Sequence, residues 1–204
     1  MYKKPVIVFE GIEGSGKSFH INSVSNFLKK KKIDHIKIRE PGGNINSEKI
    51  RKLILNNKSS FNENTDLLLY LAARSENIHQ LKKYHKKKVI LIDRFVDSTL
   101  AYQHFGFGVN LSLIMKINDY LLENFKVDFT FLNIVNHKNM INRLSKRKKL
   151  NRYDNFKKDF YEKVQKGFLK IAYKKKKKYQ IINSNLEIEN NKKIVINKIE
   201  KLIK

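Results

Sequence analysis

Short apolar runs alternate along the chain with longer segments in which apolar residues recur every three or four positions. The runs predict five β-strands, at residues 5–10, 35–39, 89–92, 129–134 and 179–182. The amphipathic segments predict a helix that ends near residue 32 and further helices at about residues 47–55, 64–84, 98–105, 111–124, 138–145, 159–178 and 188–203. This alternation predicts an α/β fold with a mainly parallel sheet. Because no repeat or linker interrupts it, we expect one domain over residues 1–204.

The composition narrows the class of protein. Hydrophobic residues make up 41% of the chain and aromatic residues 11%, which is typical of a protein that folds around a core. The absence of cysteine excludes disulfides, thiolate metal sites and a catalytic thiol. No apolar run reaches the ~20 residues that span a bilayer, and no signal-peptide pattern precedes the first strand. We therefore expect a cytoplasmic protein without a membrane partner.

The chain carries 44 lysine and arginine residues against 19 aspartate and glutamate residues, a formal net charge of +25. Such a charge is also found in nucleic-acid-binding proteins. The lysines, however, occur in nearly every predicted helix, and the runs at residues 29–32 and 174–178 end two helices, where cations favour the helix dipole. We interpret them mainly as solvated helix ends and expect no specific nucleic-acid partner. The seven arginines are more informative, because their planar forks bind phosphates at fixed geometry.

A glycine-rich segment separates the first strand from the first helix. Residues 11–18 read Gly-Ile-Glu-Gly-Ser-Gly-Lys-Ser and fit the phosphate-loop (P-loop) pattern G-x-x-x-x-G-K-[ST] in its strand-loop-helix context. Its backbone N–H groups can surround a phosphate, Lys17 can reach the β- and γ-phosphates, and Ser18 can bind Mg²⁺. The motif therefore predicts a bound nucleoside triphosphate. The residues expected to bind it are Gly11, Glu13, Gly14, Ser15, Gly16, Lys17 and Ser18.

Charged residues also follow two other predicted strands. Asp93 and Arg94 follow the strand at 89–92, and Arg39 ends the strand at 35–39 before a Pro-Gly-Gly turn. An Asp at the carboxyl end of a parallel strand lies beside the P-loop, where it can bind Mg²⁺ directly or through water. Two arginines at two strand ends form a candidate clamp for the phosphate of a second substrate, although each alone could be an ordinary ion pair.

Over its whole length the chain resembles the thymidylate kinase family of P-loop kinases. The resemblance rests on the P-loop and its preceding Phe-Glu, and on Arg-Glu-Pro-Gly-Gly at 39–43, Tyr-Leu-Ala-Ala-Arg at 70–74, Asp-Arg at 93–94, Ser-Thr-Leu-Ala-Tyr-Gln at 98–103 and Leu-Asn-Arg at 150–152. It implies a three-layer P-loop NTPase sandwich, in which helices flank a parallel five-stranded sheet, with a mobile basic lid. It also implies a homodimer that transfers the γ-phosphate of ATP to dTMP, giving dTDP for dTTP synthesis.

The resemblance implies a role for each residue of the acceptor site. Glu13 would face the sugar 3′-hydroxyl, and Arg39 and Arg94 would hold the 5′-phosphate of dTMP. Tyr70 would stack on thymine, where the family often has Phe, and Arg74 would reach the base O4. The remaining residues are Ser98 and Thr99 around the base, Tyr102 against C2′ of the sugar, and Gln103 beside it.

Simpler interpretations stay open for some of these residues. Tyr70 and Tyr102 could be core aromatics, and Glu13 could be a solvated loop acid. Arg51, within the helix at 47–55, matches an arginine in part of the family, but a role on the helix surface is favoured for it.

A basic break between two predicted helices is the candidate lid. Its cations are Arg143, Lys146, Arg147, Lys148, Lys149 and Arg152. An arginine that moves onto the transferred phosphoryl group stabilises the transition state, and a closed lid excludes water. Family members with Gly at the position of Gly14 supply this arginine from the lid, which implies Arg147 and Arg152 here. A solvated charge run is the alternative. Many members also have Asp at the position of Asn151, so Asp154 is a candidate replacement partner for Arg152.

The predicted reaction is direct in-line transfer from ATP with Mg²⁺. The acceptor phosphate is already anionic near neutral pH, with a second pKa of ~6, so the reaction needs no strong general base. The expected catalytic residues are Lys17, Arg94, Arg147 and Arg152, with Ser18 and Asp93 at the metal and Asn183 in the adenine loop. The alternatives are a P-loop kinase for another monophosphate or a deoxynucleoside, and a nucleic-acid-binding ATPase. A GTPase is disfavoured because the chain has no N-K-x-D element.

Overall fold

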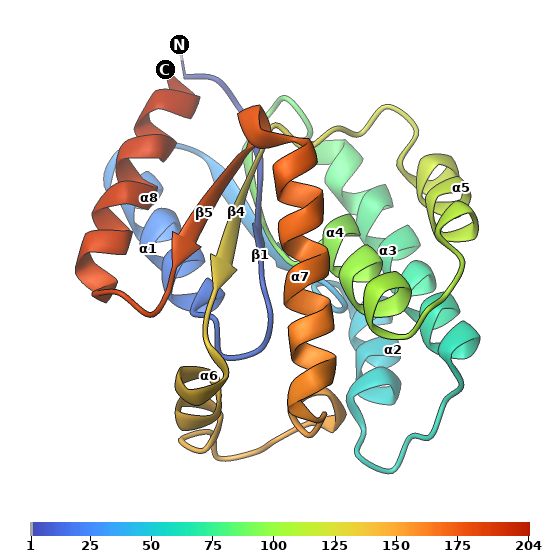
Figure 1. Cartoon of the computed structure of the whole chain (residues 1–204). Helices are drawn as coiled ribbons and strands as arrows, with labels where there is room; N and C mark the ends of the chain where they lie inside the picture. The colour runs from blue at the N-terminus through green and yellow to red at the C-terminus, as the bar shows by residue number, and fades with distance from the viewer. Residues whose placement is uncertain (1) are drawn as a thin grey trace.

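The computed structural model describes residues 2–204, whose five strands form a parallel sheet in the order β2-β3-β1-β4-β5 (Figure 1). The strands are β1 (Val6–Glu10), β2 (His35–Arg39), β3 (Val89–Asp93), β4 (Phe129–Ile134) and β5 (Tyr179–Asn183). Phe9 of β1 lies opposite Asp93 of β3 on one side and Phe131 of β4 on the other. The predicted strands and their parallel arrangement are confirmed.

The helices connect these strands. They are α1 (Lys17–Lys30), α2 (Ile45–Leu55), α3 (Glu63–Tyr84), α4 (Val96–Thr99), α5 (Leu111–Leu122), α6 (His137–Leu144), α7 (Lys158–Lys174) and α8 (Ile188–Ile203). A π-helix, η1 (Leu100–Gly106), continues α4, and two 3₁₀ turns, η2 (Arg152–Asp154) and η3 (Lys176–Lys178), flank α7.

Asparagine side chains begin four of the helices. Asn44, Asn62, Asn110 and Asn136 each accept a hydrogen bond from the backbone N–H group three residues later, at the starts of α2, α3, α5 and α6. This bond satisfies one of the donors that a helix N-terminus leaves free. The asparagine-rich sequence thus defines where these helices start.

Both faces of the sheet are covered, so the strands are buried between two helical layers. Side chains on successive strand residues point to opposite faces. Ile7 and Phe9 of β1 pack with α1 and α8, whereas Val6 and Val8 pack with α3 and neighbouring residues. Figure 1 shows α1 and α8 on one side of the sheet and α7, α3 and α5 on the other. This is the expected three-layer architecture.

Two predicted helices differ from the observed ones. The helix expected at 98–105 begins at Val96 and widens into η1, where the Phe107 N–H donates to the Tyr102 carbonyl oxygen at 2.9 Å, five residues back. The helix expected at 159–178 ends at Lys174, because the backbone at Lys175 leaves helical geometry and η3 follows. The wider spacing of η1 places Tyr102 and Gln103, both buried, in the wall of a cavity.

The carboxyl ends of the strands share one edge of the sheet because all pairings are parallel. Ligands of open α/β sheets bind outside this edge. Glu10, Arg39, Asp93, Ile134 and Asn183 end the five strands there. In the described part of the chain, no helix is long and apolar enough to cross a membrane.

Candidate active site

The P-loop connects β1 to α1 and is shaped by its glycines. Gly14 and Gly16 have φ angles of 65° and 87°, in the left-handed region that glycine adopts without strain. A Cβ atom on Gly11 would lie 2.2 Å from the carbonyl oxygen of Asn133 in β4, so glycine is required where the loop passes the neighbouring strand. The loop therefore presents its backbone at the N-terminus of α1, where an anion is favoured.

Lys17 begins α1 and turns back into the loop. Its Nζ donates to the carbonyl oxygens of Gly11 and Ile12, both at 2.8 Å. Burial, together with the positive charge of Arg94, lowers the pKa of Lys17 to about 7. A phosphate bound to the loop would favour the charged ammonium form of Lys17.

A cavity of about 170 Å³ lies beside the P-loop and gathers most of the predicted site. It is lined by Glu13, Lys17 and Ser18 of the loop and α1, by Tyr70 and Arg74 of α3, by Asp93, Arg94, Ser98, Thr99, Tyr102 and Gln103, and by Arg147 of the lid. Segments far apart in the sequence therefore meet in one hollow, as the resemblance implies. Arg39, Arg152 and Asn183 are not among its lining residues.

Arg94 is the central cation of the cavity. Its φ of 67° lies in the left-handed region, which is strained for a residue with a side chain. Its Nη2 donates to Glu13 Oε1 at 2.7 Å, and its guanidinium lies 5.2 Å from the centre of the Tyr102 ring. The Tyr102 hydroxyl donates to the other Glu13 oxygen at 2.5 Å. Glu13 is therefore a buried, paired carboxylate and not a solvated loop acid.

Two buried polar groups in the cavity wall have no hydrogen-bond partner within the described chain. They are Thr99 Oγ1 and Gln103 Nε2, on consecutive turns of α4 and η1. An unpaired buried polar atom is costly, so both atoms are suited to a ligand with complementary groups. A pyrimidine base, with its carbonyl oxygens and ring N–H, has groups of this kind.

Arg74 and Tyr70 line the same part of the cavity from α3. Arg74 is almost fully buried, with Nε on Glu40 at 2.8 Å, Nη1 on Asn118 at 2.6 Å, and its guanidinium against the Phe95 ring. Burial raises the pKa of Glu40, and the pairing with Arg74 opposes this shift. The fixed guanidinium is thus part of the wall and needs no ligand to hold it.

Arg39 and Arg51 lie near each other, but the sequence did not show which of them lines the cavity. Arg39 is exposed and forms a forked ion pair with Glu48, at 2.9 Å and 3.1 Å from Nη2. Arg51 lines the cavity, and its Nη1 donates to the Pro41 carbonyl oxygen at 2.6 Å. The sequence favoured a role on the helix surface for Arg51. Of these two arginines, however, it is Arg51 that lines the cavity.

The lid follows α6 and closes on η2. Asp154, which is buried, accepts from Arg147 Nη1 at 2.7 Å and from the Asn151 N–H at 2.9 Å, so that Asn151 and Asp154 cap η2 reciprocally. Arg152 forms an ion pair with Asp66 of α3, not with Asp154. Asn151 stands where many family members have Asp. Arg152 instead pairs with Asp66, which lies 86 residues away in the sequence.

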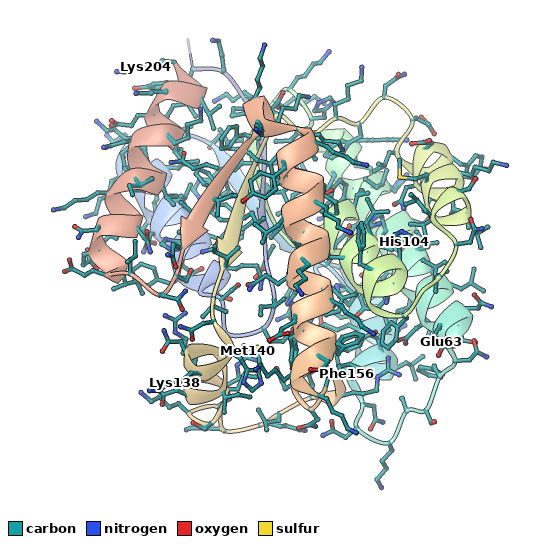
Figure 2. The ribbon with its side chains drawn as sticks, in the orientation of Figure 1. Glu63, His104, Lys138, Met140, Phe156 and Lys204 are labelled. Atoms are coloured by element: carbon teal, nitrogen blue, oxygen red, sulfur yellow. The ribbon has the colours of Figure 1, made fainter. Side chains whose placement is uncertain are left out.

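Aromatic rings support the lid from below. Phe156 lies at the foot of α7, where Figure 2 labels it, and stacks on Phe160 with ring centres 4.2 Å apart. The Tyr153 ring lies 5.4 Å from Phe156, 6.0 Å from Tyr70 and 5.7 Å from Tyr102. The lid is thus packed directly against the residues that line the cavity.

One position that supports the site, Glu10, was missed by the sequence reasoning. Glu10, at the end of β1, accepts from the Phe95 N–H at 2.8 Å and from the Ser98 hydroxyl at 2.5 Å, and so anchors the start of α4. Burial and the nearby Asp97 raise the pKa of Glu10 to about 7. The position of Glu10 directly before Gly11, the first residue of the P-loop motif, was the sequence signal that could have indicated this role.

Arg143 was predicted only as one cation of the lid. Its Nη1 donates to the Gly14 carbonyl oxygen at 2.9 Å and its Nη2 to the Ser184 carbonyl oxygen at 2.5 Å. The Ser184 hydroxyl also donates to the Ser15 carbonyl oxygen at 2.7 Å. The P-loop is thereby joined to the loop after β5, where Asn183 is exposed and accepts from the Asn185 N–H.

Comparison with known proteins identifies relatives over nearly the whole chain. A family model described as thymidylate kinase matches residues 9–195. The thymidylate kinase of Thermosipho africanus (strain TCF52B) is 38% identical over 186 residues, 90% of this chain and 92% of the relative. That of Acholeplasma laidlawii (strain PG-8A) is 35% identical over 198 residues, 96% of this chain and 98% of the relative. A crystal structure of thymidylate kinase from Ehrlichia chaffeensis superposes with a TM-score of 0.77 at 28% identity, covering 97% of this chain and 98% of that one.

Proposed function

Because the chain belongs to the thymidylate kinase family, it is a phosphotransferase that uses ATP and dTMP, and we propose that residues 1–204 act as one kinase domain which binds both nucleotides at the carboxyl edge of the sheet. One observation carries the proposal. The P-loop residues Lys17 and Ser18 line the same cavity as Arg94, Thr99 and Gln103. A donor phosphate on the loop and an acceptor phosphate at Arg94 would then face each other.

The transfer follows from positioning and charge. The dTMP phosphate oxygen attacks the γ-phosphorus of ATP in line, the new P–O bond forms as the bond to the β-phosphate oxygen breaks, and ADP leaves. Lys17 and Arg94 neutralise the charge that meets at the reacting groups. With an anionic acceptor, none of the cavity carboxylates has to remove a proton.

The residues that would hold Mg²⁺ are Ser18 and Asp93. Both line the cavity beside Lys17, and a hydroxyl and a carboxylate are oxygen ligands of the kind that Mg²⁺ prefers. Mg²⁺ commonly takes one or two protein ligands and completes its shell with phosphate oxygens and water, so two ligands suffice. The ion, when bound, would offset the charge of the triphosphate.

Acceptor recognition is assigned to the wall opposite the P-loop. The unpartnered Thr99 hydroxyl and Gln103 amide would pair with the thymine edge, while Tyr70 and Arg74 would contact its face and O4. The buried Tyr102 ring, held by Glu13, leaves little room for a ribose 2′-hydroxyl. Arg94 and Arg51 would bind the phosphate. Arg39 would join them only by leaving Glu48.

The nucleotide specificity of the acceptor site tests the proposal. Transfer from radiolabelled ATP should be at least about 100-fold more efficient to dTMP than to UMP, AMP or GMP. A purine base would leave the polar groups of the site unpaired, and the ribose 2′-hydroxyl of UMP would meet the Tyr102 ring. Equal efficiency with any of these three acceptors would show that the assignment of the acceptor is wrong.

ATP affinity is expected to fall as the pH rises above about 7. The pKa of Lys17 is lowered to about 7 in the free chain, and a bound triphosphate favours the charged ammonium, so binding takes up a proton at higher pH. The affinity then falls by up to about tenfold per pH unit until the pKa of the complex is reached. Calorimetric titration with ATP at about pH 8 in two buffers of different ionisation heat measures this uptake. Identical heats in the two buffers would contradict it.

We extend the proposal to a homodimer built on α3 and α5. Leu68 of α3 and Leu111, Leu113 and Tyr120 of α5 are exposed although they are large and apolar, and Tyr120 is 81% exposed. Light scattering should give twice the 24.2 kDa chain mass, and the double variant Leu113→Glu, Tyr120→Glu should shift it toward one chain. A wild-type mass of one chain would exclude the dimer.

A further inference from the structure

Lysines precede every strand of the parallel sheet. We call the surface they form the amino-end face. It comprises the strand-start segments 2–5, 29–34, 82–88, 123–128 and 174–178, and the chain end at 201–204. Its lysines are Lys3, Lys4, Lys29, Lys30, Lys31, Lys32, Lys82, Lys83, Lys86, Lys87, Lys88, Lys126, Lys174, Lys175, Lys176, Lys177, Lys178, Lys201 and Lys204. All are exposed except Lys4 and Lys88, which are half-buried.

The parallel topology places these segments together. In an all-parallel sheet the strand starts share the edge opposite the carboxyl ends, so runs that are scattered in the sequence meet in space. The end of α8 belongs to the same edge, since the Lys3 N–H donates to the Ile203 carbonyl oxygen at 2.8 Å. Figure 1 shows both chain termini at this end, and Figure 2 labels Lys204 there and Lys138 at the opposite end.

The positive charge of this face is not neutralised locally. At the carboxyl edge and the lid, Arg39, Arg74, Arg94, Arg147 and Arg152 each form an ion pair with a carboxylate. On the amino-end face, as far as the structure describes it, Lys82 with Glu123 forms the only ion pair. Asp128 accepts from the Val6 N–H instead of pairing with a lysine. The excess charge of the chain is thus concentrated on one face.

We propose that the amino-end face binds the phosphodiester backbone of nucleic acid, separately from the nucleotide cavity. Five neighbouring strand starts at about 4.8 Å spacing extend over roughly 19 Å. Phosphates repeat about every 3.4 Å along one strand of a duplex, so several can contact the face together. The strands, each five or six residues long, separate this face from the catalytic edge by about 16 Å.

The exposed side chains of the face favour nucleic acid over a lipid surface. The exposed large apolar side chains in or next to its segments include Tyr2 and Tyr173, at 46% and 57% exposure. Within the segments, no aliphatic side chain of the described residues is fully exposed. Aromatic rings among cations can stack on bases, whereas insertion into a bilayer interface requires an apolar helical face.

The test compares two quadruple variants of equal charge. The first, Lys30→Gln, Lys87→Gln, Lys126→Gln, Lys177→Gln, neutralises the amino-end face. The control, Lys49→Gln, Lys138→Gln, Lys163→Gln, Lys166→Gln, neutralises exposed lysines elsewhere. The probe is a dye-labelled 20-residue oligodeoxyadenylate without a terminal phosphate, measured by anisotropy in rising salt with ATP and dTMP absent or saturating. Thermal unfolding and dTMP phosphorylation check that each variant folds.

We expect the wild-type chain to bind the oligonucleotide equally well with and without saturating ATP and dTMP. At ~0.1 M salt the amino-end variant should bind at least about tenfold more weakly, and the slope of log K against log salt should fall by about 2 to 3. In the control variant, the loss of affinity and the change in salt slope should each be less than half as large. Competition by dTMP or equal weakening in both variants would overturn the proposal, as would tighter binding to vesicles of anionic phospholipid. If the first variant fails to fold, the wild-type competition and vesicle measurements still decide.

Discussion

Arg147→Ala is expected to lower kcat by about 1,000-fold while changing the KM for dTMP by less than about threefold, because an arginine on the transferred phosphoryl group acts mainly in the transition state. Arg147 lines the cavity, and its side chain is 42% exposed and pairs with Asp154 at 2.7 Å. We therefore infer that its guanidinium exchanges the Asp154 carboxylate for a phosphoryl oxygen during transfer. Steady-state kinetics at saturating ATP measure both constants.

Arg152→Ala provides the comparison within the same lid. Arg152 is paired with Asp66 and lies outside the cavity lining, so we infer that it anchors η2 to α3. Its loss should reduce kcat less than the loss of Arg147, and Asp66→Asn should reproduce its effect. If Arg152→Ala were the more damaging change to kcat, with Asp66→Asn near wild type, the catalytic role would belong to Arg152.

Arg94→Ala should reduce kcat/KM for dTMP by about 1,000-fold. A hydrogen bond to a charged group contributes about 1.5–3 kcal/mol, and a forked contact with the acceptor phosphate supplies two. The variant would also leave Glu13 buried without the cation 2.7 Å from it. Arg94→Lys keeps the charge and loses the fork, so it should recover only part of the efficiency. Initial rates measured over a range of dTMP concentrations give kcat/KM for the wild-type chain and for both variants.

Arg39→Ala serves as the matched control at a neighbouring strand end. Its guanidinium is 54% exposed and pairs with Glu48, so its loss should cost at most about tenfold in kcat/KM. A loss comparable to that of Arg94→Ala would mean that Arg39 leaves Glu48 and takes part in binding the acceptor phosphate.

The parts of the fold that could be predicted from the sequence are those with local signals. The buried runs of β1 and β3 and the glycines of the P-loop are each recognised from residues that are adjacent in the sequence. Arg39 could not be placed in this way, because its partner Glu48 lies on the next helix and side chains at a strand end can point to either face. The sequence located the strand end and left the direction of the side chain undecided.

Long-range partners account for the other differences in the site. Asp66 pairs with Arg152 across 86 residues, and Glu10 reaches Phe95 across 85, so neither contact leaves a pattern along the chain. The π-helical hydrogen bond of Phe107 is likewise invisible in the 3.6-residue periodicity that predicts an ordinary helix. The P-loop motif and the family resemblance could therefore identify residues of the cavity, but not the bonds that hold them.

Because of the wide turn of η1, we expect acceptor selection to depend on chain length as well as on side-chain chemistry. Deleting one residue between Leu100 and Gly106 would restore four-residue hydrogen bonding and rotate the two sides of the deletion by about 100° relative to each other. Gln103 and Phe107 would then lose their relative orientation, although neither had been replaced. In an alignment of relatives, we therefore expect a one-residue gap in this segment to accompany a change in substrate choice.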